Sequence, residues 1–170
     1  MSWLTRSRQR LTEFSRKRDT PDDLWTKCSA CGAMLAVREL EDHLWVCRRC
    51  GHHERIGPRK RFSTLFDGDL YTEIPVASPP DDPLEFTDSK PYPQSLEEAR
   101  KKTGEQDAML LARGKISGQE AVVGVQDFAF MGGSMGIGVG AAFVAGARAA
   151  LDNGLPYVVF TAAGGARMQE

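Results

Sequence analysis

Residues 28–50 read Cys-Ser-Ala-Cys-Gly-Ala-Met-Leu-Ala-Val-Arg-Glu-Leu-Glu-Asp-His-Leu-Trp-Val-Cys-Arg-Arg-Cys and contain every cysteine of the chain. Cys28, Cys31, Cys47 and Cys50 form two Cys-x2-Cys pairs separated by 15 residues. Each pair places two thiolates on one side of a tight turn, and two pairs supply the tetrahedral sulfur set that Zn2+ prefers. The spacing predicts a zinc ribbon over residues 25–56 that binds one Zn2+ in a closed, structural site.

The sequence leaves open what the four cysteines bind. Reduced cysteines without metal are one alternative, and an iron–sulfur cluster is another because soft thiolate sites accept either metal. His52 and His53 follow the last cysteine directly. Since four thiolates already complete a zinc shell, we expect both histidines to lie outside it.

The residues between the two cysteine pairs predict the local structure of the ribbon. We expect strands at 34–37 and 44–46, joined by a turn that carries three acidic residues. Gly32 and Gly51 each follow the second cysteine of a pair, where the turn favours a positive φ.

Charge is distributed unevenly along the chain. Residues 1–60 hold 13 Lys and Arg against 8 Asp and Glu, a net +5, whereas residues 61–170 hold 9 against 15, a net −6. Basic residues gather about the second cysteine pair, namely Arg48, Arg49, His52, His53, Arg55, Arg59, Lys60 and Arg61. Such a surface either binds RNA or DNA, docks a protein subunit, or is simply solvated.

Residues 1–24 form a polar, basic arm in which Trp3, Leu4, Leu11 and Phe14 stand at loosely helical spacing. This spacing predicts either a short amphipathic helix or an unstructured arm. The arm lacks the apolar segment of a secretory signal, and no apolar run in the chain is long enough to predict a membrane span.

The rest of the chain predicts an α/β domain behind a connecting segment. Residues 57–107 are rich in proline and contain two expected short helices, at 59–66 and 95–103. A hydrophobic domain is expected from residue 108. Its expected elements are strands at 109–116 and 121–128, a helix at 141–152, a strand at 157–160 and the first turn of a helix at 166–170.

A glycine-rich segment separates the second of these strands from the helix. Gly136–Ala141 fits the Gly-x-Gly-x-x-Ala pattern of a dinucleotide-binding turn, but no acidic residue follows the next strand to hold a ribose. A P-loop is excluded because the chain has no Gly-Lys-Ser/Thr. Residues 108–170 also contain no His or Cys. The glycines therefore either expose backbone N–H groups that stabilise negative charge or allow tight packing of helix on strand.

Several motifs along the whole chain resemble one family. They include Trp-Thr-Lys-Cys at 25–28, Cys-Gly-His-His at 50–53, Phe-Ala-Phe-Met-Gly-Gly-Ser-Met-Gly at 128–136 and Gly-Gly-Ala-Arg-Met-Gln-Glu at 164–170. Together they resemble the carboxyltransferase β subunits of bacterial and plastid acetyl-CoA carboxylase. The last two motifs are the specific ones, whereas a zinc ribbon alone is shared by many proteins.

The resemblance implies a crotonase-like fold built from ββα units and a reaction in fatty-acid synthesis. In this family the carboxyl group of carboxybiotin, on a carrier protein, passes to acetyl-CoA and gives malonyl-CoA. The biotin nitrogen removes the methyl proton and backbone N–H groups stabilise the enolate. The implied partners are a carboxyltransferase α subunit in an α2β2 heterotetramer, the biotin carboxyl carrier protein and the ATP-dependent biotin carboxylase, in the bacterial cytoplasm or, alternatively, the plastid stroma.

The resemblance also assigns residues. Gly164 and Gly165 match the family's active-site glycines, and Arg167 either contacts the CoA phosphates or holds the loop. Ala163 stands where the family usually has Ser. Family members are longer, and the resemblance implies that their main oxyanion donor for the acyl-CoA is a later Gly-Gly pair that this chain does not contain. We therefore expect a truncated carboxyltransferase domain that is inactive alone. Two other functions remain open: carboxyl transfer to another acyl-CoA, and nucleic-acid-binding regulation through the ribbon.

Overall fold

The computed structural model describes residues 24–78 and 80–170, so the basic arm expected at 1–24 lies outside the described residues apart from Leu24. The chain divides into two compact units, Met1–Arg55 and Ile56–Glu170. Within the described residues, no helix has both the length and the apolar character needed to cross a membrane.

The first unit is a small ribbon with a short helix. Strand β1 (Trp25–Lys27) pairs antiparallel with β2 (Met34–Ala36), and helix α2 (Val37–Asp42) follows at once. The predicted strand at 44–46 is wrong because Leu44 and Trp45 adopt φ values of 53° and 63°, in the left-handed region. The acidic residues expected in a turn belong to α2 instead.

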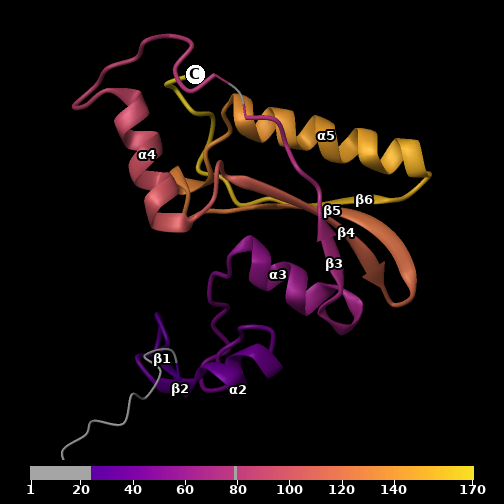
Figure 1. The fold of residues 1–170 in the computed structure, drawn as a ribbon. Helices are drawn as coiled ribbons and strands as arrows, with labels where there is room; N and C mark the ends of the chain where they lie inside the picture. The colour runs from indigo at the N-terminus through magenta and orange to yellow at the C-terminus, as the bar shows by residue number, and fades with distance from the viewer. Residues whose placement is uncertain (1–23, 79) are drawn as a thin grey trace, which may run out of the picture. The chain divides into compact units, whose positions relative to one another are not determined.

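The second unit is built on a four-stranded sheet with the order β3-β4-β5-β6 (Figure 1). Its strands are β3 (Tyr71–Glu73), β4 (Met109–Ile116), β5 (Gln119–Gln126) and β6 (Tyr157–Phe160). The first three are antiparallel neighbours, and β6 runs parallel to β5. Residues 56–107 belong to the same compact unit as the sheet.

The central hairpin joins β4 to β5 through two residues, Ser117 and Gly118. Their φ values of 51° and 80° match the type I′ turn, in which both central residues need positive φ. The strand predicted at 109–116 is confirmed, but its partner begins at Gln119, two residues before the predicted start. The Asp67 carboxylate, in the short helix η1 (Asp67–Asp69), accepts the N–H groups of both turn residues at 2.9 and 2.7 Å.

Helices cover both faces of the sheet because successive strand side chains point to opposite faces. Helix α3 (Pro58–Leu65) packs Phe62 against one face, together with Phe66 just beyond it. Helices α4 (Tyr92–Thr103) and α5 (Ile137–Asn153) lie on the other face, as Figure 1 shows for α5. The expected helices at 59–66 and 95–103 are therefore confirmed, and both contribute to the core.

Helix α5 supplies the crossover that two parallel strands require. It begins at Ile137, four residues before the predicted start, so much of the glycine-rich segment is helical. It ends where Gly154 adopts a left-handed φ of 62°, as the sequence predicts. After β6, no helix forms at 166–170; instead Ala166 makes a parallel bridge to Met135.

Candidate functional site

The four cysteine thiols of the ribbon meet in one cluster. Their sulfur atoms all lie within 4.8 Å of one another, with Cys28 3.7 Å from Cys50 and Cys31 3.8 Å from Cys47. Zn–S bonds of about 2.3 Å in a regular tetrahedron separate neighbouring sulfurs by about 3.8 Å. The cluster therefore has the size and chemistry of a four-thiolate zinc site.

Backbone geometry about the thiols supports this cluster. Gly32 and Gly51 have φ values of 70° and 72°, as predicted, and each donates its N–H to the first cysteine carbonyl of its pair. Burial alone would raise the pKa of the Cys47 thiol, but hydrogen bonds from backbone N–H groups of Arg49 and Cys50 outweigh it and lower the pKa to about 7. Backbone hydrogen bonds would also lower the pKa values of Cys28 and Cys50, but burial and hydrogen bonds to the neighbouring thiols outweigh them and raise both. The backbone therefore favours the thiolate, the form that a metal binds, at Cys47 but not at these two cysteines.

The two histidines lie outside the sulfur cluster. The His52 ring is hydrogen-bonded to the Ser29 hydroxyl at 2.8 Å, and His53 forms a backbone bridge with Val46. Neither belongs to the group of close metal-binding side chains in the described residues.

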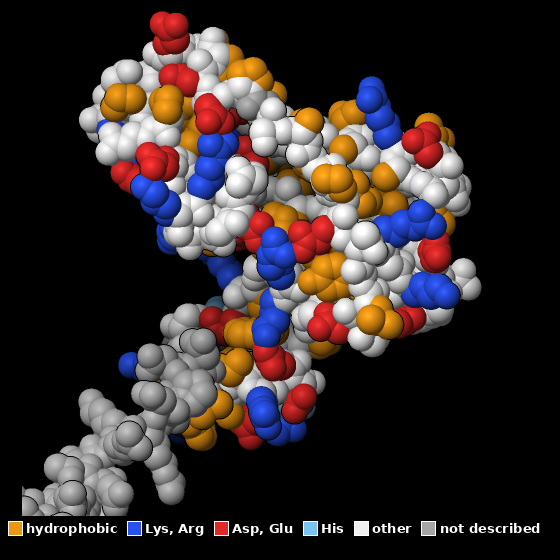
Figure 2. Space-filling view, in the orientation of Figure 1, with side chains coloured by type: hydrophobic (Ala, Val, Ile, Leu, Met, Phe, Trp, Pro, Cys, Tyr) orange, Lys and Arg blue, Asp and Glu red, His pale blue; other side chains and the backbone are white. Residues whose placement is uncertain are grey.

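Part of the predicted basic surface is neutralised within the second unit. Arg59 pairs with Glu73 and with Glu105, the latter at 2.8 Å. Arg61 lies over the Phe160 ring, 5.1 Å from its centroid. Acidic and basic side chains alternate over the face in Figure 2 rather than gathering by sign. These observations give no support to an RNA- or DNA-binding surface on this unit.

The specific glycine motifs form two loops that lie against each other. Gly164 donates its N–H at 2.9 Å to the carbonyl of Gly132, in the short helix η2 (Met131–Gly133). Met135 donates to the Gly165 carbonyl at 2.9 Å, and Arg167 N–H donates to the Met135 carbonyl at 3.0 Å. These bonds align the 164–167 backbone along the 132–135 backbone.

Gln126, at the end of β5, ties the same two loops together from the sheet. It is 5% exposed, and its side chain donates to the Gly133 carbonyl at 3.2 Å and accepts the Ala162 N–H at 3.1 Å. Both ends of the amide are therefore satisfied, one on each loop.

Gly165 is the position at which this pair of loops opens outward. Its φ of 144° favours glycine, and a Cβ there would meet no atom within 4 Å. The Gly165 N–H makes no hydrogen bond within residues 24–78 and 80–170. Gly164 differs because its N–H is already bonded to Gly132. Of the two glycines that the resemblance singles out, only Gly165 keeps a backbone donor for a ligand.

The Arg167 side chain is fully buried in this structure, whereas the predicted contact with CoA phosphates stays a prediction. Its guanidinium pairs with Asp107 at 2.7 Å and with Glu170 at 3.1 Å. It also donates to the Ser134 hydroxyl at 3.1 Å, the Ser134 carbonyl at 3.0 Å and the Tyr92 hydroxyl at 3.1 Å. Arg167 therefore holds the loops, which is the other role the sequence allowed.

Electrostatics in this cluster keep the arginine charged and the tyrosine neutral. Burial alone would lower the pKa of Arg167, but hydrogen bonds to Asp107 and Tyr92 outweigh it and raise the pKa. Burial and a hydrogen bond to Glu170 raise the pKa of Tyr92 above its ordinary value. The Tyr92 hydroxyl therefore keeps its proton and donates a hydrogen bond to the Glu170 carboxylate.

The N-terminus of α5 is occupied by the protein's own carboxylate. Glu170 accepts the Ile137 N–H, and a Cβ on Gly136 would collide with the same carboxylate. Gly138 is packed equally tightly against Asp107. A dinucleotide phosphate would need this helix end, so the dinucleotide-binding alternative fails and these glycines serve close packing.

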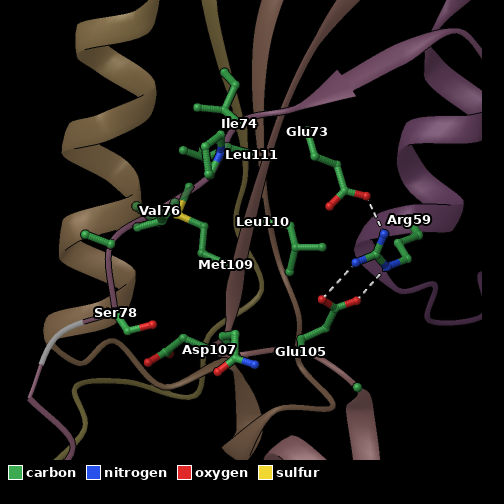
Figure 3. Close-up of a pocket in the computed structure, with 16 residues that line it drawn as sticks. Arg59, Glu73, Ile74, Val76, Ser78, Glu105, Asp107, Met109, Leu110 and Leu111 are labelled. Atoms are coloured by element: carbon green, nitrogen blue, oxygen red, sulfur yellow. Dashed lines mark hydrogen bonds and ion pairs between the residues drawn. The ribbon is translucent and has the colours of Figure 1, made fainter.

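A pocket of about 350 Å3 lies between β3, β4 and α5 (Figure 3). Ile74, Val76, Met109 and Leu111 give it an apolar wall. The Arg59 ion pairs lie on the other side, and Asp107 lines the pocket near the end that precedes β4.

The sequence does not predict a role at this site for three residues: Asp107, Tyr92 and Gln126. Each is a polar residue beside or within an apolar segment, and only the fold shows that Arg167 and the glycine loops lie next to it. A polar side chain bordering a buried strand, as Asp107 and Gln126 do, is the signal that could have identified two of them.

Comparisons with known proteins identify both units. An acetyl-CoA carboxylase zinc finger domain matches residues 25–50, and a carboxyl transferase domain matches residues 82–170. The chain is 52% identical over 170 residues to the acetyl-coenzyme A carboxylase carboxyl transferase subunit beta of Novosphingobium aromaticivorans, covering 100% of this chain and 59% of that protein. The corresponding subunit of Dinoroseobacter shibae is 48% identical over 171 residues, with 100% of this chain and 53% of that protein covered.

The chain thus spans a little over half the length of these curated relatives. Among solved structures, a transcarboxylase 12S structure is similar with a TM-score of 0.49 and 28% identity, covering 68% of this chain and 20% of that one. The predicted zinc ribbon followed by part of a carboxyltransferase domain is confirmed by the two family matches.

Proposed function

Because the chain belongs to the carboxyl transferase domain family, we propose that it acts as the β part of an acetyl-CoA carboxylase carboxyltransferase. The reaction moves a carboxyl group from carboxybiotin on a carrier protein to the methyl carbon of acetyl-CoA and yields malonyl-CoA. The observation that carries this proposal is the similarity of 48–52% identity that runs through the ribbon and the α/β unit together.

The chemistry proposed for this chain is stabilisation of negative charge by backbone. When a proton leaves the methyl group, charge develops on the thioester oxygen. The unbonded N–H of Gly165 is the group proposed to donate to that oxygen. The glycine loops, residues 128–136 and 161–168, contain no acid, histidine or cysteine, so we assign the proton transfer to the biotin nitrogen.

Zinc is proposed as the occupant of the four-thiolate cluster. With four protein sulfurs the ion has no open position, so its role is to hold the ribbon folded. Cys28, Cys31, Cys47 and Cys50 are its proposed ligands.

The proposed partners are a carboxyltransferase α subunit, in an α2β2 assembly, and the biotin carboxyl carrier protein that biotin carboxylase loads. The outer face of α5 supports a protein partner. It exposes Ile137, Val144 and Leu151 by 43, 47 and 81%, and exposed apolar side chains gathered on one helix face are typical of surfaces that another protein covers.

The test is carboxyl transfer by the assembled carboxyltransferase that contains this chain. The complex is supplied with carboxylated carrier protein and either acetyl-CoA or propionyl-CoA, and each carboxylated product is measured by mass spectrometry. We expect malonyl-CoA as the main product. Preference for propionyl-CoA would assign the chain to another acyl-CoA, and no transfer to either substrate would refute the proposal.

A further inference from the structure

The two glycine loops need an anchor because neither lies in a regular strand or long helix. Their backbones bond to each other through Gly164, Gly165 and Met135. Mutual bonds alone leave the pair free to move as one body. The loops are fixed to the rest of the unit by the chain itself, which continues into β5, α5 and β6, and by side chains that reach the sheet or the helices. Gln126 is one such side chain, and it bonds both loops.

Arg167 makes this connection on the loop side. Its backbone N–H bonds the Met135 carbonyl, and its side chain bonds both the hydroxyl and the carbonyl of Ser134. Arg167 is thus hydrogen-bonded to two successive residues of the facing loop, Ser134 and Met135.

Asp107 makes the connection on the sheet side. Its two carboxylate oxygens receive Nη2 and Nη1 of Arg167 at 2.7 and 3.2 Å, the paired geometry that a guanidinium fork favours. The same carboxylate accepts the Ala108 N–H at 2.6 Å, so its position is set by the residue that leads into β4. Its side chain is only 14% exposed.

We propose that Asp107 is a positioning residue, whose carboxylate acts through the buried Arg167 guanidinium to hold the Gly164–Gly165 loop in place for carboxyl transfer. This inference rests on the proposed function for its catalytic consequence. Asp107 does not touch the reacting atoms; it determines where the Gly165 N–H points.

The variant Asp107→Asn tests the ion pair with Arg167 while it leaves the volume of the side chain almost unchanged. Asn keeps the size of the side chain but presents one N–H2 group to a guanidinium that has only donors. Arg167→Lys keeps the charge but cannot bond Asp107 and Ser134 together through a planar fork. If geometry rather than charge matters, the two variants should behave alike.

The matched control is Asp81→Asn. Asp81 holds Arg100 with the same two-bond geometry, at 2.7 and 3.0 Å, on the surface and away from the glycine loops. Loss of this pair removes an Arg–Asp contact of the same two-bond form but exposed to solvent, and no bond to the glycine loops is lost. Arg100 also donates to the Gln106 carbonyl, a bond that the substitution leaves in place.

The experiment measures hydrogen–deuterium exchange and turnover in the same assembled carboxyltransferase. We expect Asp107→Asn and Arg167→Lys to speed amide exchange across residues 161–167 while the β4–β5 hairpin stays protected. We expect kcat for malonyl-CoA formation to fall roughly 10- to 100-fold, since small misplacements of catalytic groups cost that much. The KM for acetyl-CoA should stay within about twofold, and Asp81→Asn should resemble the wild type in both measurements.

Wild-type exchange at 161–167 in Asp107→Asn would overturn the proposal, whatever the turnover. Faster exchange with unchanged kcat would also overturn it, because the loop would then be held by Asp107 but not used in transfer. An inactive wild-type complex would count against the proposed function alone, since the exchange measurement still decides whether Asp107 holds the loop. If Asp107→Asn loses hairpin protection, Ser134→Ala tests the same connection from the other end of Arg167.

Discussion

Gly133 and Ala162 lie so close that a Cβ on Gly133 would stand well under 3.0 Å from the Ala162 carbonyl oxygen. The two residues belong to the two glycine loops, which therefore pack backbone against backbone at this point. Gly132, one residue earlier, has almost the same φ of 67° but open space around it. Alanine substitutions at Gly132 and Gly133 therefore distinguish two costs. Both substitutions strain the backbone, but only the one at Gly133 also forces the Ala162 backbone away.

We expect Gly132→Ala to lower the free energy of unfolding by about 1–2 kcal/mol, the cost of a left-handed conformation for a residue with a Cβ. Gly133→Ala should cost clearly more because the added methyl also pushes the Ala162 backbone away. Urea unfolding of both variants measures the difference. Equal losses of unfolding free energy in the two variants would show that the close packing of the two loops at Gly133 does not contribute to stability.

Gly165→Ala should reduce turnover by about 100- to 1000-fold, the usual effect of losing one oxyanion donor. The reason is its φ of 144°, which a residue with a Cβ adopts only under strain, so the N–H moves. Gly57→Ala is the control, because this glycine has an ordinary φ of −75° and a Cβ there would meet no atom within 4 Å. Malonyl-CoA formation by the assembled complex is the measurement, and wild-type turnover in Gly165→Ala would remove Gly165 from the site.

Cys47→Ala should release the bound metal and unfold the ribbon unit. Cys47 is fully buried, and binding of structural zinc contributes on the order of 10 kcal/mol to folding of such modules. Metal analysis should find one zinc in reduced wild-type protein and almost none in the variant, with protease cleavage confined to residues before 56. The exposed Arg49→Ala is the control, and a wild type with well under one zinc would contradict the assignment.

The Asp81–Arg100 pair should stabilise the protein only above mildly acidic pH. Hydrogen bonds from Arg100 lower the pKa of the Asp81 carboxyl below its usual value. The pair therefore contributes above about pH 4, where unfolded Asp is ionised, and the contribution is lost as pH falls through the lower folded pKa. Because Asp81 is 52% exposed, we expect Asp81→Asn to cost at most about 1 kcal/mol at pH 6.

Denaturant unfolding at pH 6 and pH 2 measures this effect, with the exposed Asp88→Asn as control. The difference between Asp81→Asn and the wild type should vanish at the lower pH. A difference that persists there would assign the loss to packing rather than to charge.

Local patterns in the sequence predict the parts of this fold that local interactions determine. The strand at 109–116 and the one at 157–160 are found as predicted, because runs of branched and apolar residues bounded by turns have few alternatives. The cysteine cluster follows from spacing alone. Gly154 ends α5 because only a residue without a Cβ adopts that conformation easily.

Where the predicted secondary structure is wrong, contacts between residues far apart in the sequence determine the observed structure. Glycines 138 and 140 weaken a helix locally, yet α5 includes both. Gly138 packs against Asp107, where a Cβ would collide, and this contact is not visible in the sequence. Residues 166–170 have helical character in isolation, but Ala166 pairs with Met135 and the Arg167 side chain is buried by partners up to 75 residues away. No pattern within a short window of sequence reports such partners.

The two-residue turn between β4 and β5 also determines an order of assembly. Ile116 pairs with Gln119, so only the two turn residues separate the first of the eight residue pairs in this hairpin. Each further pair forms next to the previous one, and little entropy is lost in closing a loop. Strand β3 pairs with β4 only after a segment of about forty residues closes, and β6 reaches β5 only after α5 has crossed over. Hairpins form in about 1–10 μs, much faster than whole domains of mixed topology fold. The β4–β5 hairpin is therefore the element expected to form first, and the glycine loops, which depend on contacts from Asp107 to Arg167, are expected to settle last.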